Sequence, residues 1–538
     1  MTNDFNYIFQ YLDKEGVYIN KVEFEYQIQS HPDYPSFLAV SDTLTFFNIA
    51  NGVLSVGIAE IELLPDRFVA FLEIEKGQPQ FFFIEKKDST YFYSHNKTAT
   101  ALSLQELQRF WKNRVLLIEK SGADADPPAT TAKNYWVLPG LSVLLLFVLL
   151  FQSKAGLNAK LFLALPALGL FFSFAALRDL FSHKSVLLDS FCNMTSTESC
   201  EKVTQSAKWK IFETVSFSDL SLVFFSYQFI CLLLFLFIEN TEAYFETQIL
   251  LLTIALPVLF ISLYYQKFVE KMWCPVCLAI ISVILLELGY VWFYYNFDFN
   301  VTAQAILISA FVFVTVALIW FSLKKLLRQQ KELKEFHIAG NRFKRNYEIF
   351  KNNLLASEIS ANSEIESGSI ILGNKDASLK IIVVTSPFCS FCAEVHTVIE
   401  EILSKYSDLV SFDLRFNFNE VNNDARSQRV HQKLLSVYYN YGQEAFRDVL
   451  HQWFTDFATK DEKIMDRPGI MPHDDISIQE ILKEQFLWNQ ANDVAYTPSM
   501  FINGYVFPKH YERKDLLHFI IDLSEDECFI TERIKIQV

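Results

Sequence analysis

The stretch "LKIIVVTSPFCSFCAEVHTVIEEILSKY" (379–406) joins an aliphatic segment to two cysteines, Cys389 and Cys392. The β-branched residues of 379–385 predict a strand, and the residues that follow the cysteines predict a helix. A thiol at a helix N-terminus faces the positive end of the helix dipole, which favours the thiolate and makes it a nucleophile. Because only two residues separate the cysteines, they can close a disulfide within one helical turn. The stretch therefore predicts a redox-active strand–dithiol–helix unit.

The segments after this unit continue in the order of a thioredoxin fold. A strand-like "VSFDLRFN" (410–417) and a long helical insertion lead to "YTPSMFINGYVF" (496–507) and a final helix. Thr497 and Pro498 stand where thioredoxin folds place a cis-proline against the active site. Residues 369–538 thus resemble the thioredoxin-fold domains of bacterial disulfide oxidases and isomerases. The resemblance implies that the two cysteines exchange disulfides with substrates and that the Thr-Pro pair contacts them.

A second Cys-x-x-C, formed by Cys274 and Cys277 in "KMWCPVCLAI" (271–280), stands at the mouth of an apolar run. The chain has six such runs, and most of them have the roughly 20 residues that cross about 30 Å of hydrocarbon. The runs cover about 135–151, 159–178, 219–238, 247–265, 277–296 and 303–323. The first is the shortest. A zinc site shared by the two Cys-x-x-C pairs is an alternative, but two of these runs lie between the pairs.

A third cysteine pair, Cys192 and Cys200, lies between the second and third runs in "DSFCNMTSTESCEKVTQSAKWKIFETVSFSDLSLVFF" (189–225). This segment resembles the loop of the vitamin K epoxide reductase family, in which a cysteine pair precedes a transmembrane helix and two further spans lead to a membrane Cys-x-x-C. The matching residues are Cys200, Val203, Ser206, Trp209, Ile211 and Phe212, followed by Cys274 and Cys277. Glu213 and Ser221 depart from the pattern, which commonly has glycine at both places. A structural disulfide that clasps the loop is the alternative for this pair.

The family resemblance implies a relay of electrons to a membrane quinone, either menaquinone or ubiquinone. In this relay Cys200 exchanges with Cys274, and Cys277, the deeper cysteine of its pair, delivers electrons to the quinone. Ser206 is implied to support the quinone pocket, although it could equally cap a helix. Trp273, which precedes the membrane pair, could close the pocket, but tryptophan is also enriched at membrane interfaces for other reasons.

Residues 1–120 predict a small α/β domain that precedes the apolar runs. Its segment "YQIQSHPDYPSFLAVSDTLTFFNI" (26–49) resembles the cysteine-peptidase domains that cut leader peptides in bacteriocin-exporting transporters. Peptidase chemistry needs a thiolate and a nearby histidine base. The first 191 residues contain no cysteine, and Gln80 stands where that family places its histidine. We therefore expect an inactive domain that binds peptides, with His31 in a packing or capping role.

The fold class that follows is a multidomain membrane protein. The expected order is an inactive peptidase-like domain at 1–120, a linker at 121–134, a transmembrane bundle with a four-helix redox core at 135–323, a linker helix at 324–368 and a thioredoxin-like domain at 369–538. Of the eight cysteines, Cys231 is expected to be a buried apolar side chain and Cys528 to be incidental. The net charge of −15 argues against nucleic acid as a partner.

The side of the membrane on which the cysteines lie is predicted differently by two arguments. Two spans separate each cysteine pair from the next, so all three pairs share one face, as a relay requires. The resemblance favours the periplasmic face of a bacterial inner membrane. Redox chemistry favours the same face, because cytosolic reductants would drain electrons into a quinone-driven oxidase. Loop charge favours the cytoplasm, because lysine and arginine gather on the cysteine side. These residues are Lys184, Lys202, Lys208, Lys210, Lys267, Lys271, Lys324, Lys325 and Arg328, against Lys154 and Lys160 on the other face. The start of the chain does not read as a signal peptide, so the internal spans are expected to direct insertion.

The sequence as a whole predicts a quinone-dependent thiol–disulfide oxidoreductase that makes disulfides in protein or peptide substrates. One alternative is an accessory protein of a peptide exporter, in which the peptidase-like domain binds leader peptides. Another is a reductase or isomerase that runs the same relay in reverse, which the reduction potential of Cys389–Cys392 would decide.

Overall fold

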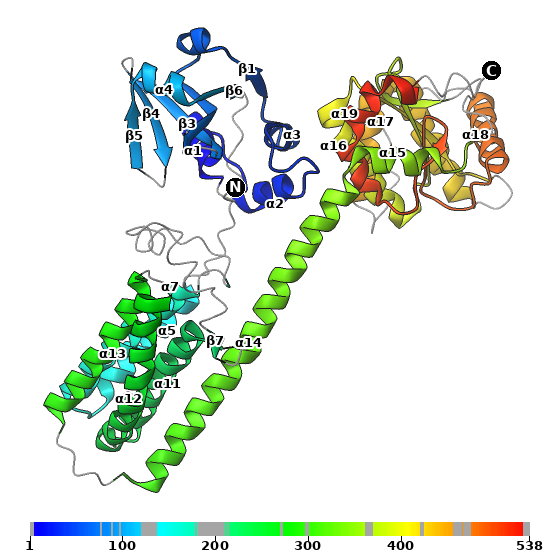
Figure 1. Ribbon diagram of the computed structural model, residues 1–538. Helices are drawn as coiled ribbons and strands as arrows, with labels where there is room; N and C mark the ends of the chain where they lie inside the picture. Colours follow the sequence, from blue (N-terminus) through cyan, green and yellow to red (C-terminus); the bar gives the residue numbers. More distant parts are fainter. Residues whose placement is uncertain are drawn as a thin grey trace. The chain divides into compact units, whose positions relative to one another are not determined.

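The computed structural model describes most of the chain and divides it into two compact units. The described residues are 5–75, 78–87, 90–95, 98–119, 137–177, 180, 210–211, 215–269, 273–295, 301–360, 369–419, 424–455, 465 and 475–530. One unit combines Met1–Ser94, Ala99–Asp124 and His337–Val538, and the other combines His95–Thr98 and Ala125–Phe336. Each is described by itself below. In Figure 1 the first residues are blue, the helical bundle is cyan to green, and the C-terminal part is yellow to red.

The N-terminal part of the first unit is a six-stranded sheet with the order β1-β6-β2-β3-β4-β5. Its strands are β1 (Asn51–Ser55), β2 (Arg67–Glu75), β3 (Gln78–Lys87), β4 (Thr90–His95), β5 (Thr98–Leu102) and β6 (Trp111–Ile118), and its helices are α1 (Asn6–Glu15), α2 (Lys21–Gln29), α3 (Phe37–Phe46) and α4 (Leu104–Phe110). Buried side chains of α1, α2 and α3 pack together with Val69, Phe83 and Leu116 of the sheet. A second cluster, which includes Leu107 of α4, contains Phe68 and Ala70 of β2. Because neighbouring residues of a strand point to opposite faces, the sheet is covered on both sides.

The second unit is a bundle of apolar helices. They are α5 (Val137–Gln152), α6 (Leu157–Phe162), α7 (Ala164–Ala176), α11 (Phe217–Phe237), α12 (Thr241–Tyr264) and α13 (Pro275–Tyr294), with α14 (Ala303–Lys344) belonging to this unit as far as Phe336. A short pair of strands, β7 (Lys210–Ile211) and β8 (Val215–Ser216), precedes α11. Within the described residues, five segments are long and apolar enough to cross a membrane. They are Leu157–Ala176, Phe217–Phe237, Thr241–Val269, Pro275–Tyr294 and Ala303–Lys344. The run predicted at 135–151 forms α5, which is shorter than these five.

The C-terminal part of the first unit is a five-stranded sheet with the order β13-β12-β10-β11-β9. Its strands are β9 (Ile370–Gly373), β10 (Leu379–Thr385), β11 (Val410–Phe416), β12 (Ser499–Ile502) and β13 (Tyr505–Val506), and its helices are α15 (Tyr347–Leu355), α16 (Ser390–Tyr406), α17 (Ala425–Thr455), α18 (Asp475–Ala491) and α19 (Ile520–Glu525). The central strands β10 and β11 run parallel, and β9, β12 and β13 pair antiparallel to their neighbours. Six of the seven residues of β10 and all seven of β11 are buried, as expected for a sheet covered on both faces. The multidomain fold class predicted from the sequence is confirmed.

Candidate functional site

The C-terminal dithiol lies where β10 gives way to α16. Cys389 is the N-cap residue of α16, and its backbone N–H donates to the carbonyl oxygen of Ser386 at 3.1 Å. The indole N–H of Trp453 donates to the carbonyl oxygen of Pro387 at 2.7 Å and so fixes the turn that leads into the helix. The local pattern of aliphatic strand, short turn and helix therefore places the predicted pair at the N-terminus of a helix.

The two sulfurs of this pair differ in exposure and in acidity. Cys389 is partly exposed, whereas Cys392 is fully buried. Partial burial alone would raise the pKa of Cys389, but hydrogen bonds from Cys392 and Thr497 and from the backbone outweigh it, and its pKa is lowered. Burial raises the pKa of Cys392 to about 11. Cys389 is thus the accessible sulfur that favours the thiolate, and Cys392 is the shielded one.

The Thr-Pro segment lies against this dithiol. The peptide bond between Thr497 and Pro498 is cis, and the thiol of Cys389 donates to the carbonyl oxygen of Thr497 at 3.4 Å. A guanidinium N–H of Arg513 donates to the carbonyl oxygen of Pro498 at 2.9 Å. The structure therefore brings together residues more than a hundred positions apart that the sequence had paired only by resemblance.

The membrane dithiol begins α13. Cys274 is the N-cap residue and Pro275 the first helical residue, a position where proline's missing N–H costs nothing. The backbone N–H of Cys274 donates to Oε1 of Gln266 at 3.0 Å, and the N–H of Cys277 donates to the sulfur of Cys274 at 3.5 Å. Gln266 lies in a π-helical turn, Tyr265–Val269, at the end of α12. The sequence did not predict a role for Gln266, because its partner Cys274 belongs to the next helix and the contact forms only when the two helices are assembled.

An apolar cavity of about 270 Å³ lies among α11, α12, α13 and α14, and Cys277 is part of its wall. Its other lining residues are Phe217, Ser218, Leu220, Ser221, Phe224, Leu251, Ile254, Ala255, Val258, Leu259, Ser262, Ile280, Ile281, Ile284 and Phe313. Cys274 is fully buried and is not among them. Cys277 is therefore the cysteine of the pair that lines the cavity. Wide aliphatic and aromatic walls of this kind suit an apolar ring.

The remaining sequence-predicted site residues either do not line this cavity or lie outside the described residues. Trp273 is half exposed and is not a lining residue of the cavity. Cys192, Cys200 and Ser206 lie outside the described residues. Cys231 is fully buried in α11, as expected for an apolar packing role, and Cys528 is an exposed free thiol.

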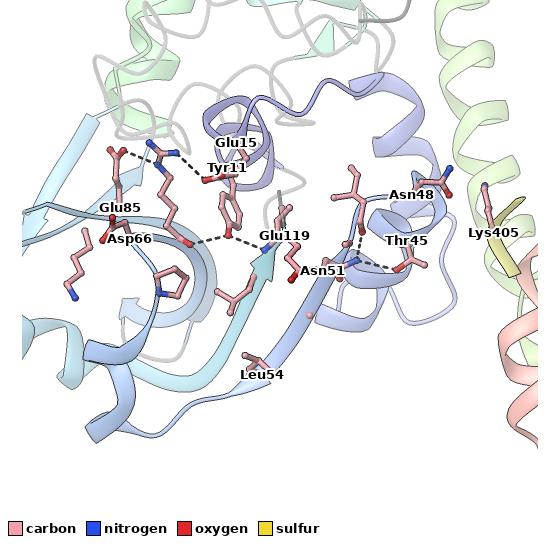
Figure 2. A pocket seen from close by; sticks show the side chains of 18 of the residues that line it. Tyr11, Glu15, Thr45, Asn48, Asn51, Leu54, Asp66, Glu85, Glu119 and Lys405 are labelled. Atoms are coloured by element: carbon pink, nitrogen blue, oxygen red, sulfur yellow. Dashed lines mark hydrogen bonds and ion pairs between the residues drawn. The ribbon is translucent and has the colours of Figure 1, made fainter. Parts of the chain in front are cut away.

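Polar side chains lining a hollow of the N-terminal domain hydrogen-bond one another. Figure 2 shows Tyr11 among them, with Glu15 and Glu85 nearby. The Tyr11 hydroxyl donates to the carbonyl oxygen of Arg67 and accepts from the N–H of Ile118, both at 3.1 Å. Arg67 in turn bonds Glu15 at 3.2 Å and Glu85 at 3.4 Å. No cysteine or histidine is among the described residues that line this hollow.

His31 and Gln80, which the sequence had singled out, occupy different places in the N-terminal domain. The N–H of Asp33 donates to Nδ1 of His31 at 3.2 Å, so Nε2 carries the ring proton and faces Asp42 at 3.1 Å. This arrangement holds the turn before α3 and agrees with the expected capping role of His31. Gln80 lines a small groove of about 50 Å³ whose other walls are largely aromatic.

Two buried polar contacts in the bundle were not predicted. Lys324 forms a buried ion pair with Asp219, which also accepts from the indole N–H of Trp320 at 3.1 Å. The amide of Gln228 donates to Glu287 at 2.8 Å, and both side chains are fully buried. A sequence signal for Glu287 exists, since it is a lone carboxyl in the apolar run "AIISVILLELGYVWF" (279–293).

Comparisons with known proteins identify the two redox segments. Residues 160–292 match the Vitamin K epoxide reductase family. Residues 366–522 match a thioredoxin family model. The resemblances stated from the cysteine motifs are thereby confirmed, and the peptidase-like resemblance of the N-terminal segment stays a prediction. A search of the curated proteins finds no match.

Several solved structures resemble part of the chain. The catalytic domain of Proteus mirabilis ScsC is 18% identical, with a TM-score of 0.25, and the match covers 36% of this chain and 98% of that one. Oxidised BdbD from Bacillus subtilis is 13% identical, with a TM-score of 0.24, and the match covers 31% and 97%. The thiol-disulfide exchange protein alpha-DsbA2 from Wolbachia pipientis is 15% identical, with a TM-score of 0.24, and the match covers 33% and 93%.

The two family matches, together with the dithiols in both segments, make this chain a thiol–disulfide oxidoreductase with a multi-pass membrane domain. The vitamin K epoxide reductase family is one that uses quinones. The question for the cavity at Cys277 is therefore whether its lining residues fit a quinone ring. Its apolar walls, which include Cys277, fit such a ring.

Proposed function

We propose that this protein oxidises substrate thiols to disulfides and passes the electrons to a membrane quinone. The observation that carries the proposal is the apolar cavity of the bundle, whose wall includes Cys277. A dithiol at the end of a membrane helix meets both a water-borne disulfide and a ligand that arrives through the lipid. The lowered pKa of Cys389 supports the oxidising direction, because a stabilised thiolate makes the reduced pair the favoured product.

The relay consists of disulfide exchanges, each of which moves two electrons. A substrate thiolate attacks Cys389 of the Cys389–Cys392 disulfide, and Cys392 leaves and takes a proton. A second substrate thiolate then releases Cys389, so the substrate gains a disulfide and the protein holds a dithiol. The same exchange next reduces Cys192–Cys200 and then Cys274–Cys277, with Cys200 attacking Cys274. Cys277 and Cys274 then return to the disulfide, and a quinone held in the apolar cavity would take up the two electrons and two protons that they release.

We also propose the domain organisation and the membrane orientation that the sequence predicts. The domain limits are 1–120, 121–134, 135–323, 324–368 and 369–538, and the redox cysteines face the periplasm of a bacterial inner membrane. The buried ion pair with Asp219 supports that orientation in one respect, because Lys324 is neutralised and no longer counts as a free loop charge. Ser206 and Trp273 are proposed to adjoin the quinone site, and the substrates are proteins or peptides with paired thiols.

A peptide-binding role for the N-terminal domain is a second proposal, favoured by the groove that contains Gln80. Its walls include Phe5, Tyr7, Tyr34 and Phe81, which offer an apolar surface to a peptide side chain. Since Gln80 supplies no general base and the first 191 residues contain no thiol, the domain would bind peptides without cutting them. Cleavage of a leader peptide by the full chain would contradict this role.

The principal test is quinone reduction by the full chain reconstituted in vesicles with a dithiol substrate. We expect Cys277→Ala to lower the rate at least about a hundredfold, because a relay stops when its terminal nucleophile is removed. Cys231→Ala is the matched control, since it removes another cysteine of the same bundle that the relay does not use, and its rate should stay within about twofold of the parent. Full turnover by Cys277→Ala would overturn the proposed terminal role.

A further inference from the structure

A buried polar layer lies one helical turn beyond the apolar cavity on all four of its helices. On α11 the lining residue Phe224 is followed four positions later by Gln228. On α13 Ile284 is followed three positions later by Glu287. The helices α12 and α14 run in the opposite direction, so on them the polar residue comes before the lining residue. Gln248 lies three positions before Leu251, and Ser309 lies four positions before Phe313. Residues three or four apart share a helix face, so the polar side chains continue the four faces that line the cavity. We call Gln228, Gln248, Glu287 and Ser309 the polar layer.

The polar layer is fully enclosed but incompletely hydrogen-bonded. Gln228, Gln248 and Glu287 have no exposed surface, and Ser309 is 6% exposed. Gln228 donates to Oε2 of Glu287 at 2.8 Å, and Ser309 donates to the hydroxyl of Thr247 at 3.5 Å. Among the described residues no partner exists for Oε1 of Glu287, for Oε1 of Gln228 or for either polar atom of the Gln248 amide.

Unpartnered polar atoms at this depth have a physical consequence. Each buried donor or acceptor without a partner destabilises the fold, and apolar surroundings supply no replacement partner. The layer therefore needs a polar occupant. Because the four faces lead directly from the cavity into the layer, a ligand of the cavity is the group placed to supply that occupant.

The free atoms of the layer match the polar edge of a quinone ring. An ionised carboxylate is very costly in an apolar bundle, and an uncharged carboxyl at Glu287 presents one O–H donor. With Oε2 accepting from Gln228, that donor is on the unpartnered Oε1. The Gln248 amide adds an N–H donor. A quinone carbonyl accepts from both, and after reduction its O–H can donate to Oε1 of Gln228.

The spacing along α13 places the polar layer at the end of the cavity that is farther from Cys277. Glu287 lies ten residues beyond Cys277, which corresponds to about 15 Å along the helix axis. Its side chain tilts back toward the helix N-terminus and thus toward the cavity. A ring whose one edge faces Cys277 therefore directs its other carbonyl toward the layer.

We propose that Glu287, together with Gln228 and Gln248, forms a polar subsite that hydrogen-bonds the quinone carbonyl remote from Cys277. The inference rests on the proposed quinone function and specifies which residues orient the ring. The subsite is a binding element, and the electrons still come from the Cys274–Cys277 dithiol.

The test uses the full chain in detergent micelles and menadione, a quinone without an isoprenoid tail. Its dissociation constant is measured by quenching of the protein fluorescence. We expect Glu287→Leu to weaken binding about tenfold, the equivalent of one hydrogen bond, and Gln248→Leu to act in the same direction. Glu287→Gln keeps a donor and should stay within about threefold. Thr253→Val is the matched control on α12, because within the described part of the chain its hydroxyl bonds only the carbonyl oxygen of Ile249 in its own helix.

A second measurement does not depend on any substitution. Dicyclohexylcarbodiimide modifies uncharged carboxyls in apolar surroundings, so mass spectrometry should find Glu287 labelled in the parent protein. Menadione should protect it. Unchanged affinity in Glu287→Leu, or labelling that menadione does not slow, would show a purely structural layer and overturn the inference. If the parent protein binds no menadione and does not reduce it, the proposed quinone function itself fails. If binding and turnover persist in Glu287→Leu, only the subsite fails.

Discussion

The hydroxyl of Thr385 lies 3.0 Å from Nε2 of His396 and also hydrogen-bonds the buried sulfur of Cys392. Burial lowers the pKa of His396 to about 3, so its imidazole is neutral at any physiological pH. When Nε2 of this neutral ring donates to Thr385, the only proton of the threonine hydroxyl is left for the sulfur. In that tautomer the pair would favour the thiolate of Cys392, which burial otherwise disfavours.

We expect Thr385→Val to slow reduction of the Cys389–Cys392 disulfide by a small dithiol about tenfold, because Cys392 must leave as a thiolate and a hydrogen bond to a charged group is worth about 1.5 kcal/mol or more. Stopped-flow fluorescence can follow the reaction, since Trp453 is bonded to the active-site turn. His396→Phe should give the same loss. Thr397→Val is the matched control, because among the residues that the structure describes the Thr397 hydroxyl bonds only Ala393 of its own helix. Unchanged rates in Thr385→Val would show that the hydroxyl has no influence on the leaving sulfur.

The same histidine predicts the acid sensitivity of the protein. A group whose folded pKa is depressed stays uncharged in the fold while the unfolded chain takes up a proton. The stability from keeping His396 neutral is thus fully present above about pH 6.5 and is lost as the pH falls toward about 3. When the pH falls from 7 to 4.5, the unfolding free energy of both proteins should decrease. We expect the decrease in His396→Phe to be smaller than that in the parent by on the order of 2 kcal/mol. Urea unfolding of the full chain in detergent, followed by tryptophan fluorescence, measures the difference, and equal losses would contradict the prediction.

Helix packing in the bundle supplies a prediction about stability. A Cβ added at Gly169 of α7 would clash with the ring of Phe225, which is fully buried in α11. We expect Gly169→Ala to destabilise the protein by about 1–3 kcal/mol, because an overpacked core forces side chains or backbone to shift. The measurement is thermal unfolding in detergent. Gly289→Ala on α13 is the matched control, since nothing lies within 4 Å of its added Cβ. Adding Phe225→Leu to Gly169→Ala should recover part of the loss, and equal stability of the two alanine variants would refute the close approach.

Local patterns predicted much of this molecule. The strand, dithiol and helix of 379–406 were predictable because local sequence patterns determine both the aliphatic strand and the start of the helix. The bundle helices were predictable from apolar length, and the cis bond at Pro498 from a resemblance.

The features that were missed depend on residues distant in the sequence. Short strands such as β1 and β9 exist because they pair with β6 and β11, and neither has a strong pattern of its own. The shielding of Cys274 and the polar layer around Glu287 require the helices to be assembled first. Lys324 was counted as a loop charge because its partner Asp219 lies more than a hundred residues away.

The order of the relay is the prediction that separates the proposed mechanism from its structural alternative. Disulfide exchange proceeds through a mixed disulfide, and removal of both resolving thiols traps that intermediate. Cys389 should be the attacking thiol, because it is the accessible sulfur with the lowered pKa while Cys392 is buried. Its target should be Cys192, which leaves Cys200 free to exchange with Cys274.

The double variant Cys392→Ala, Cys200→Ala should therefore accumulate an internal link between Cys389 and Cys192. A protease site placed within 361–368 lets the chain be cut between the two cysteines after the link has formed. On a non-reducing gel the fragments should stay joined, and addition of Cys389→Ser should release them. Fragments that separate in the double variant, or a mass spectrum that shows Cys389 bonded to Cys274, would mean that the loop pair carries no electrons. Cys192 and Cys200 would then form a structural disulfide, and the thioredoxin-like domain would exchange directly with the membrane dithiol.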